Sequence, residues 1–425
     1  MSLLAQNVIN VTDTAFLGRL GEVELGASAI AGVFYFMFFL IGIGFNQGVQ
    51  IFIGRRNGEQ NYFMIGRIVG NSITMAMVFA VMMFSLVTLF LEPLLHMVMK
   101  SERVYEASIK FMNVRVFGLF FIYLITLFRT FYIGIQNTKI LMWNAAIMAF
   151  VNVVLDYGLI FGNLGMPAMG IEGAALASVI AEGVALGHLL LHIHFKVDRN
   201  KYDLRLKPEI NISLIRELLS VSSFLMVQMA IALTPWVFFF IAIEQLGERP
   251  LAISNVLRSL YALFFIPIDS LAVASSTIVT NVIGEGGADK VKANVGRIIR
   301  LGLTVIVPIL IISAFFPRQI LQIYTSDPSL ISESIIPFYS LLTCIVFGLF
   351  GRVYFNALVG TGDTKLTMQV EMFAIFCYTI YMYIIVLVMR SPVWICWTTE
   401  HVYWILMGAA SFVMLRSGKW RRKTI

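Results

Sequence analysis

Two aspartates lie inside long apolar runs of this sequence, where charged side chains are rare. Asp13 falls in the run that ends near Gly18, and Asp156 is surrounded by apolar residues in the stretch VNVVLDYGLIFG. A charge at the centre of a bilayer costs at least about 2.5–3.5 kcal/mol, so such residues are retained mainly for function. Both carboxylates are therefore candidates for binding a proton or a small cation.

An amide and a hydroxyl are expected at the same level. Asn152 precedes Asp156 by one helical turn and shares its face. A helix rises 1.5 Å per residue, which places the two aspartates about 8–9 Å and Ser178 about 12 Å below the outer ends of their helices. Two carboxylates, an amide and a hydroxyl are oxygen ligands for Na⁺, and paired carboxylates in low dielectric can share a proton. The alternative for Asp13 is a helix cap among lipid headgroups, or an ion pair with Arg19.

Two further acids are candidates for an additional substrate or ion site. Glu182 is one turn beyond Ser178, near mid-membrane, and the alternative is a salt bridge to a neighbouring helix. Asp269 follows Pro267, which frees a backbone carbonyl, so it marks either a site or only a kink. By contrast, Glu371 lies one turn inside its apolar segment and is expected to be solvated.

No metal site is expected beyond Na⁺ at the coupling site. His188 and His192 have i,i+4 spacing, but they lie near a helix end without an acid close by in the sequence. The three cysteines form no C-x-x-C pair, so neither a disulfide framework nor structural zinc is predicted.

The composition indicates that a bilayer must surround the elements that carry these residues. Of 425 residues, 59% are hydrophobic and 13% charged, against roughly 25% charged in a soluble domain. The mean hydropathy is +0.85. The net charge of +7 does not indicate nucleic acid binding, because the basic residues fall in short loops between apolar runs.

Apolar segments long enough to cross a membrane as helices follow one another along the whole chain. Strands are not expected, because a membrane barrel alternates apolar and polar residues in segments of about ten. We predict an all-α membrane protein with twelve transmembrane helices near residues 1–18, 26–53, 66–92, 104–135, 140–162, 170–195, 213–246, 250–283, 291–316, 330–358, 366–389 and 398–416.

The distribution of Lys and Arg predicts that both termini are cytoplasmic. Three of the 31 basic residues, Arg129, Arg258 and Arg352, fall inside predicted helices. Eight fall on the other side of the membrane: Arg19, Lys100, Arg103, Lys110, Arg115, Arg249, Arg318 and Arg390. The remaining 20 lie in the loops and tail assigned to the cytoplasm, which is the asymmetry that the positive-inside rule describes.

An internal repeat divides the chain into two six-helix halves. Leu20-Gly-Glu22 recurs as Leu246-Gly-Glu248, and Gly134-Ile-Gln-Asn-Thr-Lys139 resembles Gly360-Thr-Gly-Asp-Thr-Lys365, both displaced by 226 positions. The predicted organisation is an N-lobe at 1–195, a cytoplasmic linker at 196–213 and a C-lobe with a basic tail at 214–425. Six is an even number of spans, so the halves form a parallel repeat, as in transporters that rock about a central site.

The same repeat suggests that helix 1 is truncated at its start. The seventh predicted helix begins near Ser213, and subtracting 226 places the start of the first before Met1. We therefore expect the natural protein to begin upstream.

Motifs of enzymes and of ATP-driven pumps are missing. The sequence contains no G-x-x-x-x-G-K-[ST] loop, no H-E-x-x-H and no G-x-S-x-G elbow. We expect a secondary transporter without a cofactor, with H⁺ or Na⁺ as coupling ion. A channel or receptor, which counterflow kinetics would distinguish, and an intramembrane enzyme are the less favoured classes.

Three stretches resemble the MATE (multidrug and toxic compound extrusion) transporters. They are Val11–Gly21 (VTDTAFLGRLG), the pair Asn152–Asp156 (NVVLD) and Gly173–Ser178 (GAALAS), and Gly360–Lys365 (GTGDTK). The resemblance implies a V-shaped pair of lobes and export of organic, often cationic, drug-like compounds in exchange for H⁺ or Na⁺. It also implies a multi-pass protein of the plasma membrane, the inner membrane in a bacterium, that acts as a monomer on small organic substrates.

Within this family, the DinF-like branch carries its cation site in the N-lobe. The matching positions here are Asp13, Asn152, Asp156 and Ser178, where Ser178 replaces a frequent threonine. Another branch places acids in helices 7 and 10, but those helices have only Glu244 and Glu333, near their ends. A flippase for lipid-linked precursors is the alternative function. It would need a wide cationic cavity, and the intramembrane arginines are few.

Overall fold

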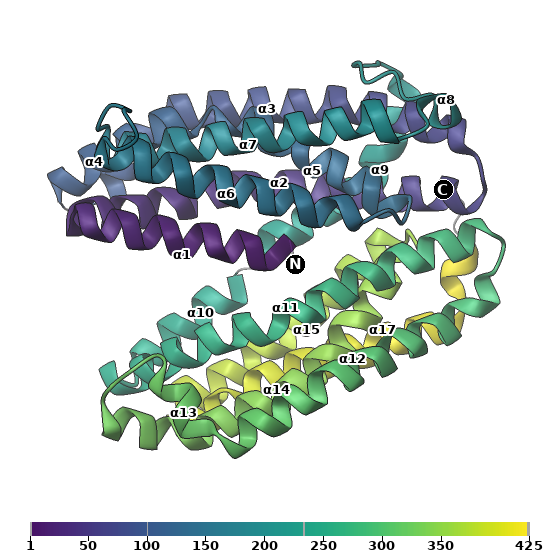
Figure 1. Ribbon diagram of the computed structural model, residues 1–425. Coiled ribbons are helices and arrows are strands. Elements are labelled where there is room, and N and C mark those ends of the chain that lie inside the picture. The colour runs from purple at the N-terminus through teal and green to yellow at the C-terminus, as the bar shows by residue number, and fades with distance from the viewer. Residues whose placement is uncertain (1, 100, 233, 423–425) are drawn as a thin grey trace. The chain divides into compact units, whose positions relative to one another are not determined.

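The computed structural model describes residues 2–99, 101–232 and 234–422, and the described residues contain helices and no strand (Figure 1). Lys100 and Lys423, both used in the charge count, lie outside the described residues. Contacts between residues divide the chain into two compact units, Met1–Met226 and Val227–Ile425. Each unit is described by itself.

The first unit is a bundle of long helices with one short helix near its end. Its helices are α1 (Ser2–Leu20), α2 (Glu22–Gly58), α3 (Tyr62–Val98), α4 (Glu102–Arg115), α5 (Gly118–Gly134), α6 (Lys139–Phe161), α7 (Gly170–Lys196), α8 (Arg199–Tyr202) and α9 (Ile212–Ile231). The division between the units falls within α9.

The second unit has the same general make-up, with several short turns between its long helices. It contains α10 (Thr234–Glu244), α11 (Glu248–Gly284), η1 (Ala288–Lys290), α12 (Val291–Phe315), α13 (Pro317–Gln322), α14 (Pro328–Gly360), α15 (Thr364–Met382), the π-helical η2 (Tyr383–Val388), α16 (Val393–Cys396), α17 (Thr398–Ser417) and η3 (Lys419–Arg422).

Each of the twelve predicted segments corresponds to one helical passage, so the prediction of an all-helical membrane protein is confirmed. In the described part of the chain, nine passages are long and apolar enough to span a membrane, and α4 with α5, bent by 52°, makes a tenth. The other two passages are α1 and α17, which are helical but contain more polar residues. Large apolar side chains exposed along the spans, such as Leu89 and Phe150, fit contact with lipid.

The repeat seen in the sequence is also present in the helices. The bounds of α2, 22 and 58, become 248 and 284 when 226 is added, and these are the bounds of α11. Gly134 ends α5 and Gly360 ends α14, again 226 apart. Both glycines lie against another helix at a place where a Cβ atom would collide, Gly134 with Ile53 and Gly360 with the backbone of Ser276. The repeated glycines therefore allow two helices to approach closely in each half.

Small residues bring α6 and α7 together in the first unit. A Cβ atom on Gly173 would collide with the backbone of Leu159, and Ala174, Ala175 and Ala177 are buried on the same helix. Close approach through small residues is the common way in which membrane helices pack. Helix α1 lies along α6 on its other side (Figure 1), so α6 is packed between the two helices that carry the remaining candidate residues.

In the second unit, α14 packs against both α11 and α17. Gly351 of α14 and Gly408 of α17 meet backbone to backbone, and Gly348 faces the ring of Phe265 on α11. Because the glycines let these helices approach closely, the ring of Trp404, one turn before Gly408, is held in the buried interior.

The predicted linker, residues 196–213, is ordered against α3. The amide of Glu209 donates to the carbonyl of Gly70 at 3.1 Å, and the amide of Asn211 donates to Oδ1 of Asn71 at 2.7 Å. The following helix, α9, begins against α2, where Ser222 donates to the carbonyl of Phe45. The first part of α9 thus packs within the first unit.

Candidate cation site

The packing of α1 on α6 brings Asp13 and Asp156 together. Their carboxyl groups lie close enough to each other to interact electrostatically. Asp156 is 0% exposed, and Asp13 is half-buried. Two carboxylates cannot donate to each other, so this contact needs a proton or a cation between them.

The packing of α6 on α7 adds the amide and the hydroxyl. Nδ2 of Asn152 lies 3.5 Å from Oγ of Ser178, at the outer limit of a hydrogen bond. Asn152 is 1% exposed, and it lies one turn from Asp156 on the buried face of α6. The structure therefore brings all four predicted residues to one place.

Most oxygen atoms of this group have no donor. Oδ1 of Asp13, Oδ1 of Asn152 and both carboxylate oxygens of Asp156 are buried without a hydrogen-bond partner among the described residues. A buried acceptor without a donor is costly. Four such atoms lie in this group. A bound proton or small cation would lower the cost of burying them, because it interacts with several acceptors at once.

Aromatic rings lie beyond the carboxyl groups toward the same ends of the two helices. Phe16 of α1 and Phe161 of α6 pack edge to face with their centroids 5.8 Å apart. Apolar rings at this place lower the local dielectric, which strengthens every charge interaction near the aspartates.

Glu182 forms an ion pair with Arg115, which is the alternative that the sequence analysis left open. The two nitrogens of the Arg115 guanidinium donate to the two carboxylate oxygens of Glu182 at 2.9 and 2.5 Å. The guanidinium also stacks over the ring of Tyr35, with its carbon 3.9 Å from the centroid. Arg115 acts electrostatically on Asp13 as well, so this pair is part of the surroundings of the cation site.

The bend between α4 and α5 positions Arg115. The helices break after Arg115, and α5 resumes at Gly118, where a Cβ atom would collide with both Arg115 and Glu182. The sequence analysis counted Arg115 with the outer charges, whereas its side chain is only 13% exposed. No local pattern in the sequence indicates this pairing, because Glu182 lies 67 positions away on another helix.

Asp269 is also paired. Nε of Arg352 on α14 donates to Oδ1 of Asp269 on α11 at 2.8 Å, and both side chains are 37% exposed. Pro267 lies inside α11, which continues through it to Gly284. Asp269 is thus neutralised by a partner of its own unit.

The expectation that Glu371 is solvated is wrong. Glu371 is 5% exposed, because it lies on the face of α15 that packs against α17. The sequence analysis also missed Glu400 on α17, which is 3% exposed. Glu400 lies in the first turn of its helix, a position that usually indicates an acid near water, and only the fold shows that the neighbouring helices cover it.

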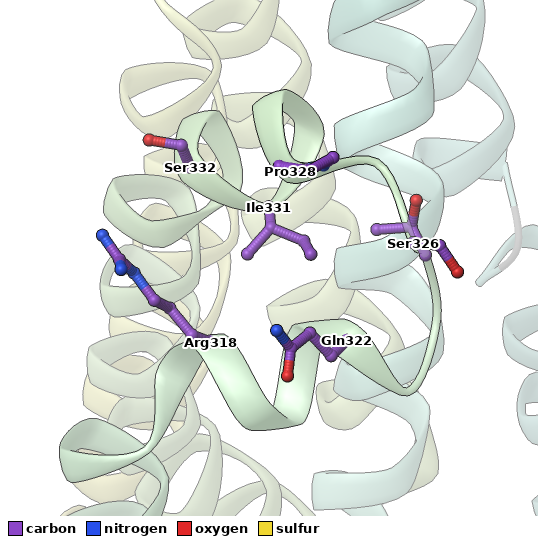
Figure 2. Close-up of a pocket in the computed structure, with 7 residues that line it drawn as sticks. Arg318, Gln322, Ser326, Pro328, Ile331 and Ser332 are labelled. Carbon is purple, nitrogen blue, oxygen red and sulfur yellow. The ribbon is translucent and has the colours of Figure 1, made fainter.

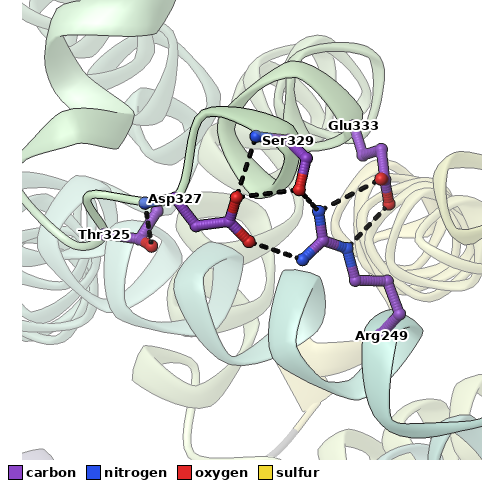
Figure 3. Close-up of polar contacts among 5 residues, drawn as sticks. All are labelled: Arg249, Thr325, Asp327, Ser329 and Glu333. Carbon is purple, nitrogen blue, oxygen red and sulfur yellow. Dashed lines mark hydrogen bonds and ion pairs between the residues drawn. The ribbon is translucent and has the colours of Figure 1, made fainter.

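The acids near the ends of the seventh and tenth predicted helices are not part of a buried site. Figure 3 shows Glu333 and Asp327 on either side of the Arg249 guanidinium, at 3.0 and 2.7 Å, with Ser329 beside it. All of these side chains are exposed to a substantial degree. Glu244 is exposed at the end of α10. Arg249, Asp327, Ser329 and Glu333 thus form a surface network of the second unit.

A polar pocket of about 550 Å³ opens beside that network, between α13 and the start of α14. Figure 2 shows Arg318, Gln322 and Ser332 around it. None of the residues that line it belongs to the aspartate group.

The two histidines bind different partners. His188 contacts Oδ1 of Asn144 at 3.0 Å, and His192 contacts the hydroxyl of Tyr132 at 2.7 Å. Within the described ranges no cluster of three or more His, Cys, Asp or Glu has a geometry suited to a metal ion.

Comparison with known proteins gives a family match. A model of the MatE family matches residues 1–158 and 219–384, which together are most of the chain. A relative in Thermotoga maritima, described as probable multidrug resistance protein NorM, is 24% identical over 99% of this chain and 90% of its own. Probable multidrug resistance protein YoeA of Bacillus subtilis is 25% identical over 77% of this chain and 71% of its own.

Solved structures show the same fold. The outward-facing conformation of a multidrug resistance MATE family transporter aligns with a TM-score of 0.90 at 17% identity, covering 99% of this chain and 94% of that one. The eukaryotic MATE transporter AtDTX14 aligns with a TM-score of 0.81 at 18% identity, covering 98% and 93%.

Proposed function

This chain belongs to the MatE family of multi-pass membrane transporters and is not an enzyme, and we propose that it exports organic, drug-like compounds in exchange for H⁺ or Na⁺. Relatives described as multidrug resistance proteins support the substrate class. The substrates are small organic molecules, cations among them.

The observation that carries the proposal is the group of acceptor oxygens without donors at Asp13, Asn152 and Asp156. A group of acceptor oxygens binds a cation or a proton, whereas an anion would be repelled by the two carboxylates. It lies between α1, α6 and α7, so its occupancy acts directly on how these three helices pack.

The coupling follows from differential affinity. An ion shifts a two-state equilibrium only if it binds one state more tightly than the other. With the site empty, the two carboxylates repel each other and the contact between α1 and α6 is weakened. With H⁺ or Na⁺ bound, the contact closes. Ion entry from outside would thus favour one packing of the first unit and substrate release, and ion loss inside would restore the other.

We propose the membrane orientation from the charge distribution. The 20 basic residues on one side against eight on the other support cytoplasmic termini, and bacterial relatives support an inner-membrane location. The proposed functional unit is a monomer, since one chain supplies both halves. The proposed division into an N-lobe, a linker at 196–213 and a C-lobe follows the 226-residue repeat.

Dye efflux from cells that lack their own pumps tests the proposal. Wild type, Asp156→Asn and the surface control Asp289→Asn are compared at equal expression, with the H⁺ and Na⁺ gradients collapsed in turn. Wild type and the control are expected to export dye until one gradient is removed, and Asp156→Asn is expected to fail. Export by Asp156→Asn at the wild-type rate would contradict the site, and export that survives loss of both gradients would contradict the coupling.

A further inference from the structure

A second buried acidic group lies in the second unit, far in the sequence from the aspartates. Glu371 of α15 and Glu400 of α17 are both almost fully buried, and their helices pack on each other. Neither acid forms an ion pair among the described residues, although Glu371 is 5% and Glu400 3% exposed. A buried carboxylate without a cation is strongly disfavoured relative to its neutral form.

One oxygen of Glu371 has no hydrogen-bond partner. Oε1 accepts from the hydroxyl of Tyr403 at 3.3 Å, whereas Oε2 is buried without a donor. The side chain of Gln228 lies next to Glu371, and its Oε1 has no donor either. Since an amide can be turned to present its oxygen, a proton on Oε2 of Glu371 would give both atoms a partner.

Glu400 accepts only from neutral groups. Its Oε2 accepts from the hydroxyl of Tyr261 at 3.1 Å, and that hydroxyl accepts from the indole nitrogen of Trp404 at 3.0 Å. The hydroxyl of Tyr378 faces Glu400 and has no well-formed hydrogen bond. A protonated Glu400 could donate to this hydroxyl, which an ionised Glu400 cannot do.

The two acids belong to one connected group. Tyr403, which donates to Glu371, follows Glu400 by three positions on α17. Its ring packs edge to face on Tyr378 of α15 at 5.9 Å and on Trp404 at 4.9 Å. A change at either carboxyl is therefore transmitted through shared aromatic contacts between α15, α17 and α11.

The charged and titratable groups that face the acids do not neutralise them. Arg352 on α14 acts on Glu371, but its guanidinium is engaged by Asp269 and lies over the ring of Trp404. Cys344 of α14 faces Glu400 as a buried thiol. His401, next to Glu400 in sequence, contacts the hydroxyl of Thr343 at 2.8 Å.

We propose that Glu371 and Glu400 form a second proton-binding site, in which both carboxyls are protonated at neutral pH and Glu371 exchanges its proton during transport. The ligand is a proton and not Na⁺. A Na⁺ ion needs several oxygen lone pairs directed at it, whereas Tyr261 and Tyr403 direct hydroxyl hydrogens at the carboxyls and aromatic rings fill the remaining space. This site extends the proposed antiport, but its protonation is independent of whether the protein exports drugs.

Infrared spectroscopy of the purified full-length protein in lipid bilayers tests the protonation directly, because a protonated carboxyl absorbs apart from a carboxylate and shifts in D₂O. Glu371→Gln and Glu400→Gln are each expected to remove part of the protonated-carboxyl band at neutral pH. The matched control Glu285→Gln, at the exposed end of α11, is expected to leave the band unchanged. An unchanged band in both buried variants overturns the proposal.

Tyr403→Phe keeps the carboxyl of Glu371 and removes the hydroxyl that donates to it. This variant replaces Glu371→Gln in the test if Glu371→Gln fails to fold. The band of Glu371 is expected to move to higher frequency, and a band that does not move overturns the contact. Added Na⁺ at constant pH is expected to leave the band intact, and loss of the band would reassign the site to Na⁺.

A transport measurement separates this site from the proposed function. In proteoliposomes, Glu371→Gln is expected to move fewer protons per substrate than wild type, and an unchanged ratio overturns the exchange of this proton. If wild type itself transports nothing while the infrared band behaves as expected, the proposed function fails and the protonation of the second site stands.

Discussion

The two units are built on one repeated frame, yet their buried polar groups occupy different positions in it. Adding 226 to Asp13 and Asp156 gives Phe239 and Met382, both buried and apolar. Adding 226 to Asn152 gives Tyr378, which faces the acids of the second unit. The frame of helices and glycines is thus shared, whereas the residues that carry charge are particular to each half.

The surroundings of the acids differ in the same way. In the first unit, carboxylate oxygens of Asp13 and Asp156 are buried without a hydrogen-bond donor among the described residues. The guanidinium of the nearby Arg115 forms an ion pair with Glu182. In the second unit tyrosine hydroxyls donate to Glu371 and Glu400. The first arrangement attracts an external cation. In the second, the tyrosine donors partly support a charged acid, but burial without an ion-pair partner among the described residues favours the neutral form. The repeat therefore preserves the packing of the helices, whereas a few side-chain differences determine which ion each half can bind.

The largest effect is expected from the buried Arg115–Glu182 ion pair, which we compare with the more exposed Arg352–Asp269 ion pair at a different position of the second unit. Glu182→Leu leaves a buried guanidinium unpaired and should lower the free energy of unfolding by about 3–5 kcal/mol. The double variant Arg115→Met/Glu182→Leu should recover most of this loss, as measured by denaturation in detergent. A double variant no more stable than the single one would show that the pair itself contributes the stability.

The next effect concerns ion coupling at positions equivalent in the two halves. Asp156→Asn should lose gradient-driven export, so that the ratio of efflux rates with and without the ion gradient falls by roughly 5- to 150-fold, the usual range of coupling between sites. Met382→Leu changes the matching position of the second unit, conserves volume and should leave the dependence unchanged. Efflux rates with and without the gradient measure the ratio. Equal losses in both variants would mean that the two halves contribute alike.

A smaller effect is expected at the half-exposed pair of the second unit. Asp269→Asn should cost no more than about 1 kcal/mol of stability, because solvent screens a pair that is 37% exposed. A double-mutant cycle with Arg352→Gln measures the pair alone. An interaction energy between Asp269 and Arg352 as large as that between Arg115 and Glu182 would contradict the proposed difference in strength between the two ion pairs.

The smallest effect is a pH dependence at the surface of the second unit. Hydrogen bonds from Arg249 and Ser329 hold the pKa of Asp327 below its usual range. A lowered folded pKa contributes stability above the usual value of about 3.9, and this contribution is lost as the pH falls through the folded pKa. Asp327→Asn should therefore flatten the acid limb of thermal stability slightly. An acid limb identical in both proteins would contradict the assignment.

Much of the fold was predictable because the bilayer imposes it. Apolar runs of sufficient length must be helical in lipid, and the glycines at 134 and 360 lie where the repeat requires close approach. The grouping of Asp13, Asn152, Asp156 and Ser178 followed from equal depth on neighbouring helices. Its role as a coupling site stays a prediction that the transport experiment tests.

Other features depend on which helices meet, and a sequence does not give those neighbours directly. Glu371 was expected to meet water because it lies near a helix end, but α17 covers it. Glu400 was missed for the same reason. The partner of Glu182 lies 67 positions away and at a bend that no local pattern indicated.

The equal bounds of α2 and α11 under one offset have a consequence for the origin of the chain. Each half has an even number of spans, so a half-length ancestor would return to the side of the membrane where it began. Two copies of such an ancestor could associate in the same orientation and later be joined by one short connection on that side, with neither copy reversed. Once joined, the copies were free to acquire different acids, and a single polypeptide could carry two unlike sites that a symmetric pair of identical subunits cannot have.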